Sequence, residues 1–248
     1  MRDCRWMQSR PLRAESGQAA VESALTLPLA VFLVLGALQL FLMLQARLMA
    51  EHAAFRAVRA GSLSQGSCRR MLQAAVTTVL PTFTRTDSAT RLARAFEAHI
   101  DNHYAPSLDS GHNGDIVWIL RQSPQASDFT GAEASAFDDP DRDSLRLEAR
   151  LIFWYPMRIP FANWVIARMA LASLGLQDYT GFNPLMPVRN ARWTQSRSPE
   201  SLEGRAAATF QARTNAPAGT YVFPIQATYG MRMMTPARRE FFNQQDCM

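Results

Sequence analysis

Lysine is absent from the 248-residue sequence, so all 26 basic side chains are arginines. Because a guanidinium stays protonated in proteins, no side chain is available for lysine Schiff-base chemistry or for the lysine of a phosphate-binding loop. Cysteine is scarce as well: Cys4, Cys68 and Cys247 are too few and too widely spaced for a zinc site or a framework of several disulfides. These absences exclude several large classes of enzyme and of small disulfide-rich domain.

The usual catalytic signatures are missing too. The sequence has no nucleophile elbow, no phosphate-binding loop, no dinucleotide-binding fingerprint and no paired metal motif. We therefore expect no catalytic residues, no cofactor-binding residues and no metal ligands, and we predict that the protein is not an enzyme.

The net charge of +5 is spread along the chain rather than concentrated in one domain. Residues 1–17 carry a net charge of +2, residues 18–61 carry +1 and residues 62–248 carry +2. The large carboxy-terminal part is therefore almost neutral. Because electrostatic attraction to phosphates dominates nucleic-acid binding, the sequence does not predict a nucleic-acid partner.

One long apolar run dominates the amino-terminal part. Residues 23–44 contain no charge, and their only polar side chains are Ser23, Thr26 and Gln39. As a helix this run would measure roughly 33 Å, close to the thickness of a bilayer core. A secretory signal peptide is the alternative, but the run is longer than a typical signal and no cleavage site of small residues follows it. The sequence predicts a transmembrane helix that continues in amphipathic form to about residue 60.

A short basic leader precedes this run. It contains four arginines and ends in Gly17, and a lone acid, Glu22, follows five residues later. This pattern resembles the class III signal of type IV pilin-like proteins, which a prepilin peptidase cuts after the glycine on the cytoplasmic side, usually before methylation of the new amino terminus. The resemblance implies cleavage between Gly17 and Gln18, which would make Glu22 the fifth residue of the mature protein.

Glu22 has two interpretations. A carboxylate inside a membrane is costly unless it is paired, and the amino-terminal ammonium of a neighbouring subunit could pair with it during assembly. Alternatively, Glu22 only complements the positive end of the helix dipole in the first turn.

The wider segment 17–61 resembles the TadE branch of this superfamily, the minor pseudopilins of tight-adherence (Flp) pilus systems. The shared features are a glycine, small residues, a Val-Glu pair, a Leu-Pro pair, a long apolar stretch and an Ala/Arg-rich helix that ends in Ala-Gly. They lie here at Gly17, Ala19, Ala20, Val21, Glu22, Leu27, Pro28, Arg47, Ala53, Ala54, Arg56, Arg59, Ala60 and Gly61. Ser23 departs from the pattern, since members commonly carry Phe there. Pro28 would kink the helix.

This resemblance implies a location and a set of partners. The amino terminus would be cytoplasmic and the domain after residue 61 periplasmic, with one span in the inner membrane and exposure at the cell surface if the subunit enters a pilus. The charge rule leaves this orientation open, because four arginines precede the span and three follow it closely. The implied partners are other pilin-like subunits, the inner-membrane assembly platform, the prepilin peptidase and the lipid bilayer.

The implied function is a non-catalytic role in assembling or priming a Flp-type pilus or a related secretion filament. An uncleaved, single-pass TadG-like assembly factor is the alternative within the same superfamily. A membrane-tethered, metal-dependent hydrolase is the alternative from another class.

For the exported part we predict an α+β fold in which helices pack on a small antiparallel sheet. The divisions are a domain at 62–195, a linker or loop at 196–219 rich in Ser, Pro, Gly, Ala and Arg, and a carboxy-terminal strand and tail at 220–248. Apolar periodicity and capping residues predict helices at about 68–80, 88–103 and 161–176. Alternating and short apolar segments predict strands at 116–121, 144–155, 188–195 and 220–229.

Histidine and cysteine provide the remaining candidates. His99 and His103 are four residues apart and would share a helix face, with His112 nearby, which is the spacing that a metal pair needs. Solvated histidines at a helix end are the favoured interpretation, because the zincin pattern lacks its glutamate. Cys68 and Cys247 would both face an oxidising periplasm, where they could form a disulfide or remain two thiols.

Overall fold

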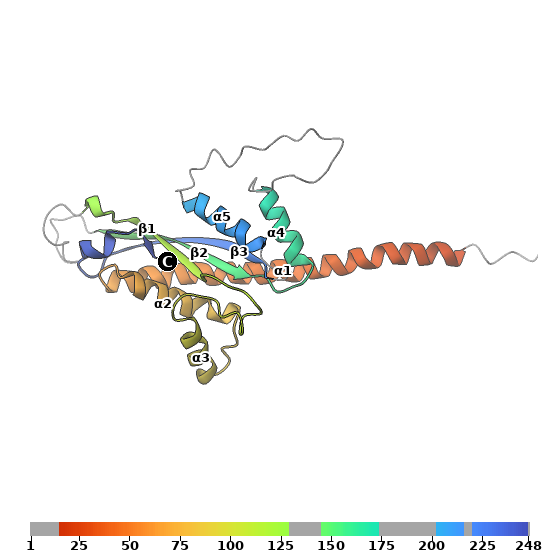
Figure 1. Ribbon diagram of the computed structural model, residues 1–248, viewed down its shortest axis with the longest axis horizontal. Helices are drawn as coiled ribbons and strands as arrows, with labels where there is room; N and C mark the ends of the chain where they lie inside the picture. The colour runs from red at the N-terminus through yellow and green to blue at the C-terminus, as the bar shows by residue number, and fades with distance from the viewer. Residues whose placement is uncertain (1–14, 129–144, 174–201, 216–219, 248) are drawn as a thin grey trace, which may run out of the picture.

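The computed structural model describes residues 15–128, 145–173, 202–215 and 220–247 (Figure 1). One long helix runs through the molecule, and a domain of shorter helices and a four-stranded antiparallel sheet packs on its carboxy-terminal half. This confirms the predicted α+β class. The helices are α1 (Glu15–Leu63), α2 (Cys68–Val79), α3 (Ala89–His99), α4 (Ala162–Ser173) and α5 (Leu202–Thr214). The strands are β1 (Val117–Ser123), β2 (Arg146–Pro156), β3 (Val222–Arg232) and β4 (Asp246–Cys247).

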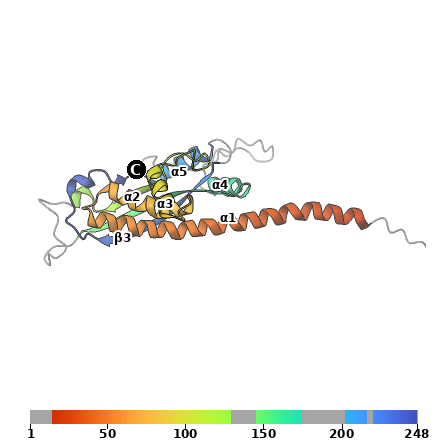
Figure 2. The same ribbon diagram turned by 90° about the horizontal axis from the view of Figure 1, so that it is seen from below.

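Helix α1 is continuous over 49 residues and passes through Pro28. Its amino-terminal half stands clear of the domain in both views (Figures 1 and 2). It ends at Leu63, three residues beyond the predicted end near residue 60, and the turn that follows places Gln65 and Gly66 at positive φ. The left-handed conformation costs glycine little, which allows the chain to reverse sharply into α2.

The carboxy-terminal half of α1 is covered by the domain through a stripe of small side chains. These residues recur every three or four positions and are almost fully buried: Ala46, Ala50, Ala53, Ala54, Ala57 and Val58. Gly61 continues the stripe, because a Cβ atom there would lie 2.7 Å from Leu147 Cδ2 and 2.7 Å from Met71 Sδ. The absence of bulk lets α1 approach both β2 and α2 closely.

The sheet has the order β3-β2-β1-β4, and all pairs are antiparallel. The strands predicted at 116–121, 144–155 and 220–229 are confirmed, with ends shifted by one to three residues. The strand predicted at 188–195 lies outside the described residues. The two-residue strand β4, which closes the edge beside β1, was not predicted, because so short a segment carries no periodicity.

The two faces of the sheet are covered by different helices. Leu147 points toward α1. On the other face, the guanidinium of Arg213 on α5 lies over the Trp154 ring, with its Cζ 4.8 Å from the ring centroid. The predicted alternation of β2 holds in its first half only, because every residue from Leu151 to Pro156 is buried. A second covering layer buries the side that the sequence pattern assigned to solvent.

The prediction of a loop or linker at 196–219 is wrong over Leu202–Thr214, which form α5. The range 202–214 contains no proline, and three consecutive alanines at 206–208 favour a helix. Phe210 is fully buried and stacks edge-on against Phe223 of β3. The sequence within 202–214 therefore permits a helix, and the packing of Phe210 on the sheet stabilises it.

The other predicted helices are present with altered ends. Helix α2 matches its predicted range within one residue, although the Ser67 side chain forms no capping hydrogen bond. Helix α3 is capped by Ser88, whose Oγ accepts a hydrogen bond from the Arg91 backbone N–H, and it ends at His99 rather than near His103. Helix α4 falls within the range predicted at 161–176, whose last residues lie outside the described part.

Candidate functional site

The half of α1 that projects from the domain carries exposed apolar side chains on all sides. Leu25 and Leu29 on one side of the helix are 71% and 62% exposed, and Leu27 and Val31 on the other side are 65% and 49% exposed. Among the described residues, α1 is the one helix long and apolar enough to cross a membrane. So large an apolar surface is unfavourable in water, so this segment is a site of contact with lipid or with other apolar helices.

Glu22 lies on this projecting segment. It is exposed, and its carboxylate forms no hydrogen bond or ion pair with any described residue, although its backbone oxygen accepts a hydrogen bond from Thr26 Oγ1 at 2.9 Å. Gly17 and Gln18 lie in the first turn of α1. Cleavage between them, pairing of Glu22 with another subunit and a kink at Pro28 stay predictions.

Gln39 is the first residue of α1 that the domain buries. The Gln39 side chain is fully buried, and its Oε1 accepts a hydrogen bond of 3.0 Å from the backbone N–H of Ile159, just before α4. The Tyr155 hydroxyl also lies here, and burial raises the pKa of that hydroxyl, partly offset by Arg158 and by a hydrogen bond with Gln39. The domain therefore begins five residues before the predicted end of the apolar span.

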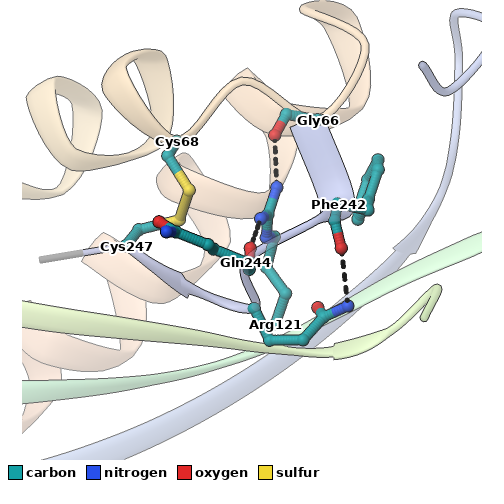
Figure 3. Close-up of a disulfide and its surroundings, with 7 residues drawn as sticks. Gly66, Cys68, Arg121, Phe242, Gln244 and Cys247 are labelled. Carbon is teal, nitrogen blue, oxygen red and sulfur yellow. Dashed lines mark hydrogen bonds between the residues drawn. A yellow bond between two sulfur atoms is a disulfide. The ribbon is translucent and has the colours of Figure 1, made fainter. Parts of the chain in front are cut away.

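A second junction joins the carboxy terminus to the start of α2. Cys68 and Cys247 form a disulfide whose Cα atoms lie 5.3 Å apart (Figure 3). The bond closes a loop of 179 residues, almost the whole domain. It ties β4, and with it the edge of the sheet, to the helical layer.

Arg121 of β1 lies beside this disulfide and is 2% exposed. Its Nη1 donates to the Gly66 carbonyl at 2.7 Å, its Nη2 donates to the Gln244 carbonyl, and the guanidinium stacks on the Phe242 ring. Burial lowers the pKa of Arg121 to about 10, opposed by the carboxylate of Asp246. The guanidinium is still charged at neutral pH, and it holds the α1–α2 turn and the carboxy-terminal segment together.

The structure separates the three candidate histidines, and the prediction that His99 and His103 share a helix face is wrong. His99 is the last residue of α3, whereas His103 lies beyond the helix in an isolated bridge with Asp115. Their ring nitrogens have different partners. His103 Nε2 is 3.3 Å from the Asp115 carboxylate, and His112 Nδ1 is 2.7 Å from the Asp109 backbone oxygen.

His99 is held in a buried polar contact rather than in an open site. Its Nε2 lies 2.7 Å from Asp109 Oδ2 and its Nδ1 lies 2.6 Å from the Ala95 carbonyl. Both ring nitrogens lie within hydrogen-bond distance of protein oxygens, so neither is open to a metal ion. Within the described ranges, no group of three or more His, Cys, Asp or Glu side chains could hold a metal ion.

A groove of about 550 Å³ lies between α3 and the segments that flank it. Four arginines line it: Arg85, Arg91, Arg94 and Arg158. Two of them have partners, because Arg91 pairs with Asp87 at 2.5 Å, which lowers the pKa of that carboxyl, and Arg158 donates to the Phe83 carbonyl. The chemistry of this lining suits an anionic group.

Sequence reasoning missed the structural roles of Gln39 and Arg121. The signals were present: Gln39 is a lone amide within an apolar run, and Arg121 occupies the same side of its strand as Val117 and Ile119. A polar residue at an inward position indicates a buried polar contact. The partner, however, lies far away in the sequence in both cases.

Comparison with known proteins gives one result. The sequence model of the family described as TadE-like protein matches residues 17–59, the projecting half of α1 and most of its packed half. Searches of the curated proteins and of the solved structures return no significant match.

Proposed function

Because the chain is TadE-like over residues 17–59, we propose that it is a non-catalytic minor pseudopilin that assembles or primes a Flp (type IVb-type) pilus or a related secretion filament. The observation that carries this proposal is the projecting part of α1, whose apolar side chains are exposed and which bears Glu22 near its start. A helix of this kind anchors a subunit in the bilayer before assembly and packs against other subunits afterwards.

The contact at Gln39 refines the membrane span. Because the domain covers one side of the helix from Gln39 onward, the segment that could face lipid on all sides would end near residue 38 rather than at residue 44. Residues 19–38 as a helix would measure about 30 Å, the thickness of a bilayer core. With this placement Glu22 lies just inside the cytoplasmic side of the core, where an unpaired carboxylate is unfavourable and a partner's ammonium would stabilise it.

The mechanism that we propose starts with removal of residues 1–17 by a prepilin peptidase on the cytoplasmic side. The new amino terminus at Gln18 then carries a positive charge, and Glu22 of an adjacent subunit pairs with such a terminus. The domain would lie in the periplasm, and the Cys68–Cys247 disulfide supports an oxidising compartment. Gly36, which has no atom within 4 Å of the position of a Cβ, leaves room for a neighbouring helix.

The cleavage is tested by mass spectrometry of the protein purified from membranes of cells that express a prepilin peptidase. We expect a mature chain that begins at Gln18 with a methylated amino terminus. Gly17→Val should leave the full-length chain, whereas the matched variant Gly36→Val should be processed normally. An intact amino terminus in the wild-type protein would contradict the pseudopilin and favour an uncleaved TadG-like assembly factor.

The role of Glu22 is tested separately from cleavage. Glu22→Gln should be cleaved normally but should lose cross-links to neighbouring pilin-like subunits and reduce the number of pili. Glu51→Gln is the matched control, because Glu51 lies on the same helix, is half exposed and pairs with Arg47 within its own chain. Equal pilus numbers in both variants would contradict subunit pairing through Glu22.

A further inference from the structure

Helix α4 and the residue before it expose large apolar side chains. Phe161, Trp164 and Met169 are 72%, 49% and 67% exposed. We call these three residues the α4 apolar face. The opposite side of the helix is buried through Ala162, Ala167 and Leu171. Large apolar side chains on the exposed side of a helix, here accompanied by Arg168, are not typical of an element that lies between a domain core and water.

The backbone holds Phe161 in an unusual conformation. Its φ is +70°, a left-handed value that a bulky side chain rarely adopts, and its carbonyl accepts the hydrogen bond from Val165 that opens the helix. The strain is not balanced by burial, because the Phe161 ring is the most exposed of the three. Such strain at an exposed apolar side chain favours a contact outside the domain.

The position of α4 identifies that contact. The backbone N–H of Ile159, three residues before α4, donates a hydrogen bond to Gln39, which is the first residue of α1 that the domain buries. Both views show α4 beside α1 at the end of the sheet from which the projecting part of α1 emerges (Figures 1 and 2). If α1 spans a bilayer up to about residue 38, α4 lies at the level of the lipid headgroups.

The composition around α4 is typical of a segment at the level of the lipid headgroups. Between residues 156 and 173 the chain has two arginines, Arg158 and Arg168, and no acid. Aromatic rings are favoured at the interface between headgroups and hydrocarbon, and arginines attract anionic headgroups. Other apolar surfaces at this end, Leu40 and Phe41 of α1, are also exposed.

We propose that the α4 apolar face inserts into the periplasmic-side interface of the bilayer that α1 spans, which gives the domain a second membrane contact and fixes its tilt on the anchor. This inference rests on the proposed membrane anchor. Like an interfacial helix, α4 would lie in the plane of the headgroups, with Phe161 and Trp164 directed toward the acyl chains.

The contact is tested with the full-length protein in nanodiscs of phosphatidylethanolamine and phosphatidylglycerol. Cys4→Ser removes the cysteine outside the disulfide, and spin labels are attached in turn to Trp164→Cys, Phe161→Cys, Leu33→Cys and Met234→Cys. Leu33 reports on the span. Met234 is the matched control, because it is 45% exposed and its backbone bonds to Ser62, roughly 35 Å along α1 from Gln39. Collisions with oxygen, which partitions into lipid, and with a water-soluble nickel complex are compared at each label.

We expect labels at 164 and 161 to collide more with oxygen and at least threefold less with the nickel complex than the label at 234. Equal nickel accessibility at 164, 161 and 234 would overturn the inference, because the α4 apolar face would then lie in water. Low accessibility to both reagents would also overturn it, because protein rather than lipid would then cover the face. If the label at residue 33 collides freely with the nickel complex, α1 does not span the bilayer and the proposed membrane anchor is wrong. The label at residue 33 therefore separates failure of the proposed function from failure of the α4 contact alone.

Discussion

The buried carboxamide of Gln39 accepts a hydrogen bond of 3.0 Å from the backbone N–H of Ile159, 120 residues later in the chain. This contact marks the point at which the domain begins to cover one side of α1, whereas Leu40 and Phe41 on the other side are still exposed. It therefore fixes how far the domain stands from the proposed membrane surface, and it holds the start of α4 against the anchor helix.

Replacing Gln39 tests this junction. Gln39→Leu keeps the size and increases apolarity, but it removes the acceptor of the half-buried Ile159 N–H, which costs about 1 to 3 kcal/mol. We expect a lower midpoint of thermal unfolding in detergent, followed by circular dichroism. Gln122→Leu, at an exposed position of β1, should change the midpoint little. Equal midpoints for the two variants would show that the hydrogen bond contributes nothing to stability.

The disulfide between Cys68 and Cys247 should make a large contribution to stability. For a loop of 179 residues, the chain-entropy model gives about 5 kcal/mol, because the bond restricts the unfolded chain. The double variant Cys68→Ser, Cys247→Ser should unfold at a markedly lower urea concentration. Cys4→Ser should unfold like the wild type, and a double variant as stable as Cys4→Ser would argue against the bond.

Two glycines of α1 should respond in opposite ways to alanine. Gly61→Ala introduces a Cβ 2.7 Å from atoms of Leu147 and Met71, so we expect overpacking to reduce the free energy of unfolding by about 1 to 3 kcal/mol. Gly36→Ala meets no atom within 4 Å and should be neutral or slightly stabilising, because alanine favours helix. Chemical denaturation of both variants checks this, and a tolerant Gly61 would contradict the close packing of α1 on β2.

Stability should fall at alkaline pH through Tyr104. Its hydroxyl is buried and donates to the Trp154 carbonyl at 2.5 Å, and burial raises its pKa well above 10. The folded protein therefore keeps this proton where the unfolded chain releases it, so the contribution is complete below pH 10 and is lost as the pH rises above that value. Between about pH 9 and about pH 11, the urea midpoint of wild type should fall more steeply than that of Tyr104→Phe.

The control for this pH dependence is Tyr229→Phe, because Tyr229 is 40% exposed. This variant should keep the slope of the wild type. Parallel slopes for wild type and Tyr104→Phe would contradict the role of the buried hydroxyl. The lowered pKa of Arg121, about 10, has the opposite effect on stability above pH 10, because the folded protein releases this proton before the unfolded chain does. The comparison between variants is therefore more informative than the wild-type slope alone.

The sequence by itself determined the elements whose pattern repeats within a few residues. The apolar run of α1, the alternation in the first half of β2 and the start of α3 near residue 88 all depend on neighbours along the chain, so these features could be predicted. The TadE-like match has the same origin, because it covers one continuous segment.

Only the tertiary structure decided what depends on distant partners. Packing of Phe210 on the sheet stabilises α5 within a segment whose overall composition is typical of a loop. Residues more than 100 positions apart meet at Gln39 with Ile159, Arg121 with Gln244 and Cys68 with Cys247. The end of α3 at His99 likewise sends His103 to a different partner. The local sequence pattern indicates which side chains prefer burial, but the packing of the whole domain determines which of these side chains contact one another.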